Sequence, residues 1–259
     1  MAYPLVMIHG MWCTGANWNR MRELMAPRGY DCHAPTLPGH EPGPNQSQEV
    51  ASKSITEYLA FIEEYIRQQN FSRPPILIGH SMGGWIAQAI ASRSRPLGLV
   101  LLTPAAPAGI NGLRWSNLKL FTPHFARWGF THKAYKPSLA ASRRYLTNGL
   151  PPAEQERLYQ AMVHESGRTP FELGMWWADG RKAASIETSQ VKCPVYVVAC
   201  GTDGTTPAAV VKKVAAQYPQ ASQRIYPVRS HWVIEDEETE DMVNEICGWL
   251  RPLEQKLSR

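Results

Sequence analysis

A serine between two glycines is the first candidate for chemistry in this sequence. Ser81 is the third residue of the segment GHSMG, a G-x-S-x-G pattern. The apolar residues 76–78 before it predict a strand, and the helix formers of residues 85–91 predict a helix after it. Gly79 and Gly83 would keep side chains out of the space where strand and helix approach each other. Such a turn would hold the Ser81 hydroxyl above a sheet edge, beside the free N–H groups that begin the helix.

The pentapeptide alone is weak evidence, because it occurs by chance in roughly one chain in ten of this length. Its setting makes it stronger: a predicted strand before it, a predicted helix after it, and a third glycine at Gly84. With these features the chain resembles the alpha/beta-hydrolase family, whose nucleophile elbow has this form. The resemblance implies an α/β fold with a mostly parallel sheet of about six strands, flanked by helices, and an inserted helical cap.

Two further residues stand where the family keeps the partners of its nucleophile. Asp203 follows the predicted strand at residues 195–199, as in the family's catalytic-acid loop. His231 follows the last predicted strand, where the family has its general base. The order Ser81, Asp203, His231 matches the family's order. Because the carboxyl ends of parallel strands share one edge of a sheet, the three residues could converge there.

The resemblance implies acyl transfer through an acyl-enzyme, with water as the usual acceptor. His231 would take the proton of Ser81, and Asp203 would orient the imidazole and stabilise its charged form. The backbone N–H groups of Met11 and Met82 would form the oxyanion hole, each contributing about 3 kcal/mol. Both are backbone roles, so the identity of the two side chains does not test them.

Several neighbouring segments have simpler interpretations. His9 is expected to hold its loop by hydrogen bonds and not to react. Residues 41–51 are rich in Pro, Gly and Gln and are expected to form an exposed loop. Ser54 and Glu57 have the spacing of a capping box, and apolar residues then repeat at helical spacing. Residues 103–107 contain no carboxylate, so the catalytic acid cannot follow that strand as it does in some hydrolases.

The alternation of strands and helices stops between residues 108 and 187. This segment is rich in aromatic residues, and prolines divide it into short helical pieces. We expect a helical cap (108–187) between the first part (1–107) and second part (188–259) of the core. Most of its aromatic side chains would pack the cap on the core, and a few would line an apolar pocket over Ser81. The pocket candidates are Trp12, Trp128, Trp176 and Trp232.

Composition limits the other possibilities. The 259 residues carry a formal net charge of +5 without a long basic run, which does not suggest nucleic acid. The five cysteines are scattered, with neither disulfide-framework nor zinc spacing, and there is no G-x-G-x-x-G or phosphate loop. No cofactor or metal is therefore expected. Without a leader or a run of 18 apolar residues, the chain is expected to be cytoplasmic and not membrane-bound; its oligomeric state is not indicated.

The leading hypothesis is a serine esterase or lactonase acting on small to medium, partly apolar small-molecule esters. Haloalkane dehalogenases and epoxide hydrolases of this fold use Asp where this chain has Ser81. Hydroxynitrile lyases have a Lys after the histidine, where this chain has Trp232, so a lyase would lack that charge. A ligand-binding or receptor-like protein, a cofactor-free dioxygenase, a C–C hydrolase, an acyltransferase and a perhydrolase remain open alternatives.

Overall fold

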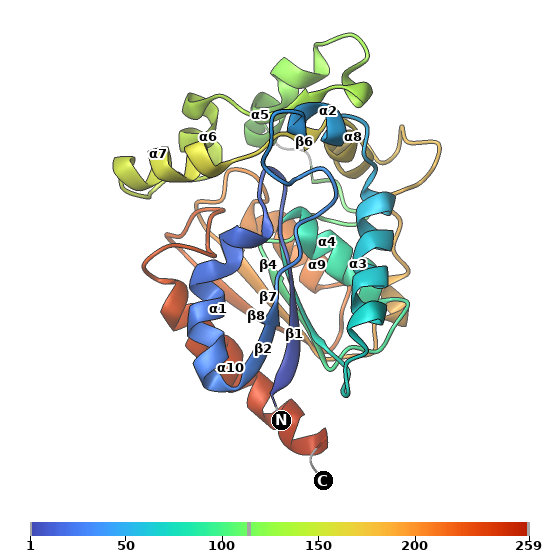
Figure 1. Cartoon of the computed structure of the whole chain (residues 1–259), viewed down its shortest axis with the longest axis vertical. Coiled ribbons are helices and arrows are strands. Elements are labelled where there is room, and N and C mark those ends of the chain that lie inside the picture. Colours follow the sequence, from blue (N-terminus) through green and yellow to red (C-terminus); the bar gives the residue numbers. More distant parts are fainter. Residues whose placement is uncertain (1, 113–114, 258–259) are drawn as a thin grey trace.

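A six-stranded parallel sheet forms the centre of the computed structural model, which describes residues 2–112 and 115–257 (Figure 1). The strand order is β2-β1-β3-β4-β7-β8. The strands are β1 (Tyr3–Ile8), β2 (Tyr30–His33), β3 (Ile76–His80), β4 (Gly98–Leu102), β7 (Val195–Cys200) and β8 (Ala221–Tyr226). The four central strands are apolar and buried almost throughout, as parallel strands covered on both faces must be. The predicted fold class is confirmed.

Helices cover both faces of this sheet because successive strand residues point to opposite sides. Val6 and Ile8 belong to one apolar cluster with helices α3, α4 and α9, whereas Leu5 and Met7 belong to a second with α1 and α10. The helices are α1 (Asn19–Met25), α3 (Ile55–Gln69), α4 (Met82–Ala91), α9 (Ala208–Ala215) and α10 (Thr239–Leu257). The sheet is thus the middle of three layers (Figure 1).

The start of α3 follows the predicted capping box. The Ser54 side chain accepts the N–H of Thr56, and the Glu57 carboxylate accepts the N–H of Ser54 at 2.8 Å. Asn70 ends the helix in the left-handed conformation. These local signals fix the helix that leads the chain into β3 and the Ser81 turn.

Residues 108–187, here called the insertion, connect β4 to β7. They form α5 (Trp115–Phe125), β5 (Ala134–Tyr135), α6 (Leu139–Tyr145), α7 (Pro152–Ala161), β6 (Glu165–Ser166) and α8 (Arg168–Gly174). The two short strands pair with each other in antiparallel fashion. Figure 1 shows these helices gathered at the end of the sheet where the strands finish, opposite the two chain termini. The predicted short helical pieces are therefore present.

The predicted exposed loop at residues 41–51 is wrong in part. The structure forms a short helix there, α2 (Gln46–Val50), and both of its end residues are buried. The Gln46 amide donates to the carbonyl of His164 at 2.9 Å, and its oxygen accepts the N–H of His164 at 3.0 Å. Because His164 belongs to the insertion, the local composition of residues 41–51 could not reveal this contact.

Candidate active site

Ser81 occupies a strained turn between β3 and α4. Its backbone has φ 53° and ψ −119°, a combination that costs on the order of 1–3 kcal/mol in a residue with a side chain. Two hydrogen bonds hold it there: its N–H donates to the carbonyl of Leu102 at 3.0 Å, and its carbonyl accepts the N–H of Ala105 at 2.8 Å. The residues around the end of β4 therefore keep Ser81 in this conformation.

Three glycines make this turn possible. A side chain at Gly79 would collide with the backbone of Gly83, and one at Gly83 would collide with the carbonyl group of Ile8. A Cβ on Gly10 would lie 2.9 Å from the Cβ of Ser81. The first turn of α4 consequently packs directly against the end of β1, which brings Met82 close to the loop containing Met11.

The structure brings Asp203 and His231 together in a buried pair. Nδ1 of His231 lies 2.8 Å from Oδ2 of Asp203, and the other carboxylate oxygen accepts the N–H groups of Thr205 and Thr206, both at 2.7 Å. Burial by itself would raise the pKa of Asp203. His231 and the two N–H donors outweigh burial, so this pKa lies below its ordinary value. Asp203 is therefore an ionised carboxylate that accepts a hydrogen bond from Nδ1–H of His231, which leaves Nε2 as the nitrogen that can take a proton.

The sequence did not single out Thr206, which completes this pair. Its Oγ1 lies 2.9 Å from Oδ2 of Asp203, 2.9 Å from the carbonyl oxygen of Thr103 and 3.3 Å from Nδ1 of His231. Thr103 itself has φ 42°, which is unusual for a β-branched residue. The signal available in the sequence was a polar residue between Asp203 and the following helix.

His80, the residue before Ser81, supports the His231 loop. Its Nε2–H donates to the carbonyl oxygen of His231 at 3.0 Å, and the centroids of the two rings are 4.9 Å apart. Burial and then the neighbouring His231 lower the pKa of His80 to about 3, so the ring is neutral. This contact ties the end of β3 to the loop after β8.

His9 has the structural role expected of it. Its Nε2 accepts the N–H of Leu37 at 2.9 Å, and its Nδ1 lies 2.9 Å from the carbonyl oxygen of Gly10. Burial, followed by the nearby His40, keeps its pKa well below the ordinary value. A neutral ring with both nitrogens engaged holds the loop after β1 in place.

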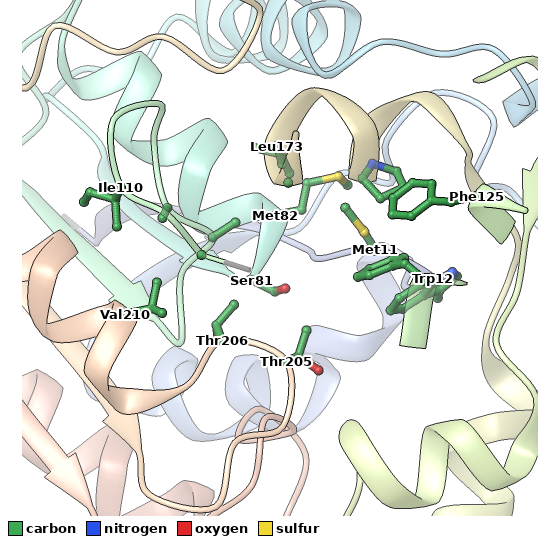
Figure 2. Close-up of a pocket in the computed structure, with 16 residues that line it drawn as sticks. Met11, Trp12, Ser81, Met82, Ile110, Phe125, Leu173, Thr205, Thr206 and Val210 are labelled. Atoms are coloured by element: carbon green, nitrogen blue, oxygen red, sulfur yellow. The ribbon is translucent and has the colours of Figure 1, made fainter. Parts of the chain in front are cut away.

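A cavity of about 90 Å³ opens beside Ser81 (Figure 2). Among the described residues that line it, none carries a charge, and most are apolar. Figure 2 shows the Ser81 hydroxyl between Met11 and Thr206. The lining residues are Met11, Trp12, Ser81, Met82, Ala105, Ala106, Ile110, Gly112, Phe121, Phe125, Pro170, Leu173, Gly174, Thr205, Thr206 and Val210.

The four tryptophans expected around the pocket have different locations. Trp12 lines the cavity. Trp128 is wrong as a pocket residue, because its side chain is 95% exposed on the insertion. Trp176 packs against Trp177 and the sheet core, and Trp232 is buried in another cluster and donates Nε1–H to Glu235 at 3.0 Å. Neither lies in the cavity wall, so these two expectations are also wrong.

Among the described residues of the insertion, the aromatic side chains that line the cavity are Phe121 and Phe125. They stand four residues apart on α5, the spacing that places two side chains on one helix face. This spacing was available in the sequence. The direction in which that face points was not, because it depends on how the insertion packs on the core.

Among the described residues, no helix has both the length and the apolar character required to cross a membrane. In the same part of the chain, no cluster of three or more His, Cys, Asp or Glu side chains is arranged to hold a metal ion. The cysteines Cys13, Cys32, Cys193, Cys200 and Cys247 are free.

The sequence matches the alpha/beta hydrolase family over residues 5–245, nearly the whole chain. The chain belongs to the alpha/beta hydrolase family. The solved structures similar to this hydrolase include an extracellular alpha/beta-hydrolase from a Paenibacillus species, with a TM-score of 0.74 at 18% identity, covering 94% of this chain and 97% of the other. A pyrethroid hydrolase from Sphingobium faniae has a TM-score of 0.67 at 21% identity, covering 97% and 98%. Likeness at this level of identity shows the fold.

Curated relatives of this alpha/beta hydrolase align over shorter stretches. A pyrethroid hydrolase from Sphingobium wenxiniae is 34% identical over 109 residues, which cover 40% of this chain and 36% of the relative. A protein from Mycoplasma pneumoniae named putative esterase/lipase 2 is 30% identical over 104 residues, covering 39% and 38%. The aligned part thus spans little more than a third of the length of either relative.

Proposed function

We propose that this alpha/beta hydrolase is a serine hydrolase that cleaves uncharged, largely apolar carboxylic esters through an acyl-enzyme. One observation carries the proposal: a buried Asp203–His231 pair, 2.8 Å apart, stands at the sheet edge where Ser81 occupies a strained turn and lines an uncharged cavity. The names of the two curated relatives, pyrethroid hydrolase and putative esterase/lipase, support ester cleavage.

In this mechanism His231 Nε2 takes the proton as Ser81 Oγ attacks the ester carbonyl carbon. Asp203 stabilises the imidazolium that forms, and its lowered pKa keeps it ionised. The N–H groups of Met11 and Met82 would stabilise the oxyanion; Met82 is the first residue of α4, so its N–H has no partner within the helix. The alcohol then leaves with the proton from His231, and water, activated by the same base, releases the acid.

The residues that line the cavity favour a substrate with a different apolar group on each side of its ester. On one side of Ser81, Figure 2 shows Ile110 and Val210, which are branched and aliphatic. On the other side it shows Trp12 and Phe125. An ester with an aliphatic group on one side of the carbonyl and an aromatic group on the other would match this division.

We also propose that the insertion acts as a cap over this site. It supplies Ile110, Phe121, Phe125 and Leu173 to the cavity wall, whereas the core supplies the reacting groups. The division of the chain into core (1–107 and 188–259) and cap (108–187) follows from this role. Drug-sized ligands require roughly 300–1,000 Å³, so admission of a large ester requires movement of the cap or of the wall side chains.

The test is the Ser81→Ala variant with a p-nitrophenyl ester and a fluorophosphonate probe. We expect wild-type protein to turn over the ester and to be labelled on Ser81, and the variant to lose at least about 10⁴-fold in activity together with the labelling. Ser94→Ala, at a serine three residues beyond the end of α4, is the matched control and should behave as wild type. A burst of one product equivalent without turnover in the wild type, or an active Ser81→Ala variant, would overturn the proposal.

A further inference from the structure

Trp12, in the loop after β1, has a backbone conformation that is rare for a large side chain. Its φ is 63°, in the left-handed region, and its side chain is 2% exposed. It occupies the third position of a four-residue turn closed by the N–H of Cys13 and the carbonyl of Gly10, at 3.4 Å. Glycine usually fills a turn position with positive φ, because any other residue is strained there. Surrounding contacts must therefore hold Trp12 in place.

The insertion supplies hydrogen bonds and a stacked ring to Trp12. Its indole Nε1–H donates to the carbonyl of Tyr135 at 3.0 Å, and its own carbonyl accepts the N–H of Val163 at 3.0 Å. Its ring stacks on Phe121 with centroids 5.7 Å apart and an interplanar angle of 24°. The insertion thus contacts both the side chain and the backbone of this one core residue.

The turn held in this way contains a candidate oxyanion donor. Met11 precedes Trp12 in the turn, and its N–H belongs to the peptide that follows Gly10. If Trp12 relaxed to negative φ, the turn would change type by rotation of the Met11–Trp12 peptide, and the loop would lose the anchor that keeps the neighbouring Met11 N–H in place. The position of the Met11 N–H therefore depends on the contacts that the adjacent Trp12 makes with the insertion.

We propose that Trp12 is a positioning residue that couples docking of the insertion to the oxyanion hole. This inference rests on the proposed serine mechanism. With the insertion docked, Trp12 keeps its strained conformation and the Met11 N–H points at the developing oxyanion. With the insertion displaced, the turn relaxes and the donor is lost. Binding of substrate beneath a closed insertion therefore assembles the site, and an open form reacts poorly.

The contact from Val163 offers a test outside the cavity wall. Val163→Pro removes the N–H that binds the Trp12 carbonyl, and Val163→Ala keeps it. The preceding residue, Met162, has φ −64° and ψ 137°, a conformation well suited to a following proline. For Val163→Pro we expect kcat to fall about tenfold with KM changed less than about twofold, because an oxyanion donor acts in the transition state. Val163→Ala should retain kcat.

A trifluoromethyl ketone inhibitor provides the readout that a purely structural role would not move. Its adduct with Ser81 carries an oxyanion, so its affinity should fall by the same factor as kcat in Val163→Pro. Trp12→Phe gives a second route, since it keeps a ring against Phe121 and loses the N–H to Tyr135. It should show the same joint loss of kcat and inhibitor affinity, whether or not Val163→Pro folds.

The possible outcomes separate this inference from the proposed function. Ser81-dependent turnover in the wild type tests the mechanism independently. If that holds and both Val163→Pro and Trp12→Phe, folded by thermal unfolding, retain kcat and inhibitor affinity, the coupling is wrong. A change in KM alone would also overturn it, because that would make Trp12 only a wall of the cavity. Joint loss of kcat and inhibitor affinity supports it.

Discussion

The sheet and the insertion are held in place by different kinds of interaction. The sheet is a continuous parallel ladder covered by two apolar clusters, so many equivalent contacts share its stability. The insertion docks through a few specific contacts, among them two buried carboxylates. Glu165 binds His40 and Tyr58, and Glu172 binds the Ser54 hydroxyl and the N–H of Ile55. Loss of one such contact leaves a buried polar group without its partner, which is costly.

The core and the insertion also contribute different parts of the site. Loops of the core carry Ser81, Asp203 and His231, whereas α5 and α8 of the insertion contribute much of the apolar wall. Changes in the core loops should therefore affect the reaction rate. Changes in the insertion away from its contacts with Trp12 should affect which esters react and how firmly the insertion is attached. The following variants test that separation.

The largest effect is expected at Asp203. Asp203→Asn replaces an acceptor by an amide that can present N–H groups to His231 Nδ1, which favours the tautomer with its proton on Nε2. We expect kcat to fall about 10⁴-fold for aromatic and aliphatic esters alike. Steady-state kinetics on both substrates measure this, with Asp31→Asn, at an exposed surface carboxylate, as the control. A loss confined to one ester class would contradict the assignment of the chemistry to the core.

A smaller effect is expected at Thr206. Thr206→Val keeps the shape of the side chain and removes the hydroxyl that contacts Asp203 and the Thr103 carbonyl. Loss of one hydrogen bond to a charged group corresponds to about a tenfold lower kcat. Thr206→Ser should restore most of it, since the hydroxyl returns. If valine and serine give equal rates, Thr206 contributes packing and does not position the pair.

Phe125 tests the contribution of the insertion to selectivity. Phe125→Ala removes an aromatic wall of the cavity while leaving every reacting group in place. We expect kcat/KM for a naphthyl ester to fall about tenfold, with a much smaller change for a purely aliphatic ester. Val210→Ala, on the opposite side of Ser81, should show the reverse preference. Equal losses on both substrates in both variants would mean that the two sides of the cavity do not discriminate.

The sequence was sufficient for the core because its signals are local and repeated. The apolar run before Ser81 predicted β3, and the capping box at Ser54 predicted the start of α3. The closeness of Asp203 and His231, which are 28 residues apart, followed from the rule that parallel strands end at one edge. Family resemblance chose these residues among several carboxylates and histidines.

The insertion could not be predicted to the same depth. Nothing local distinguishes Trp128, which is exposed, from Phe125, which lines the cavity. Their difference depends on how α5 packs on the core, and that packing is fixed by contacts between distant residues such as Trp12 and Tyr135, 123 positions apart. Gln46 was likewise expected in an exposed loop because its partner lies 118 residues away. Single polar contacts of this kind have no periodic signature.

Glu172, one of the two carboxylates that attach the insertion, gives the smallest and most specific prediction. Burial raises its pKa above the ordinary 4.5, although the Ile55 N–H and the Ser54 hydroxyl act in the opposite direction. The folded state therefore holds this proton at a higher pH than the unfolded chain does. The protonated Glu172 side chain therefore adds to the free energy of unfolding. This stabilisation is fully present below about pH 4.5 and is lost as the pH rises through the raised pKa.

Comparison with Glu57, the carboxylate of the capping box, tests the direction in which stability changes with pH. The N–H of Ser54 and then Lys53 lower the pKa of Glu57 despite an opposing effect of burial, so its contribution is lost as the pH falls. On lowering the pH from about 7 to about 5, the Tm of wild type should rise relative to that of Glu172→Gln, and it should not rise relative to that of Glu57→Gln. Groups common to all three proteins cancel. Parallel Tm curves for wild type and Glu172→Gln would show that this carboxylate does not sense pH, and that attachment of the insertion depends on its other contacts.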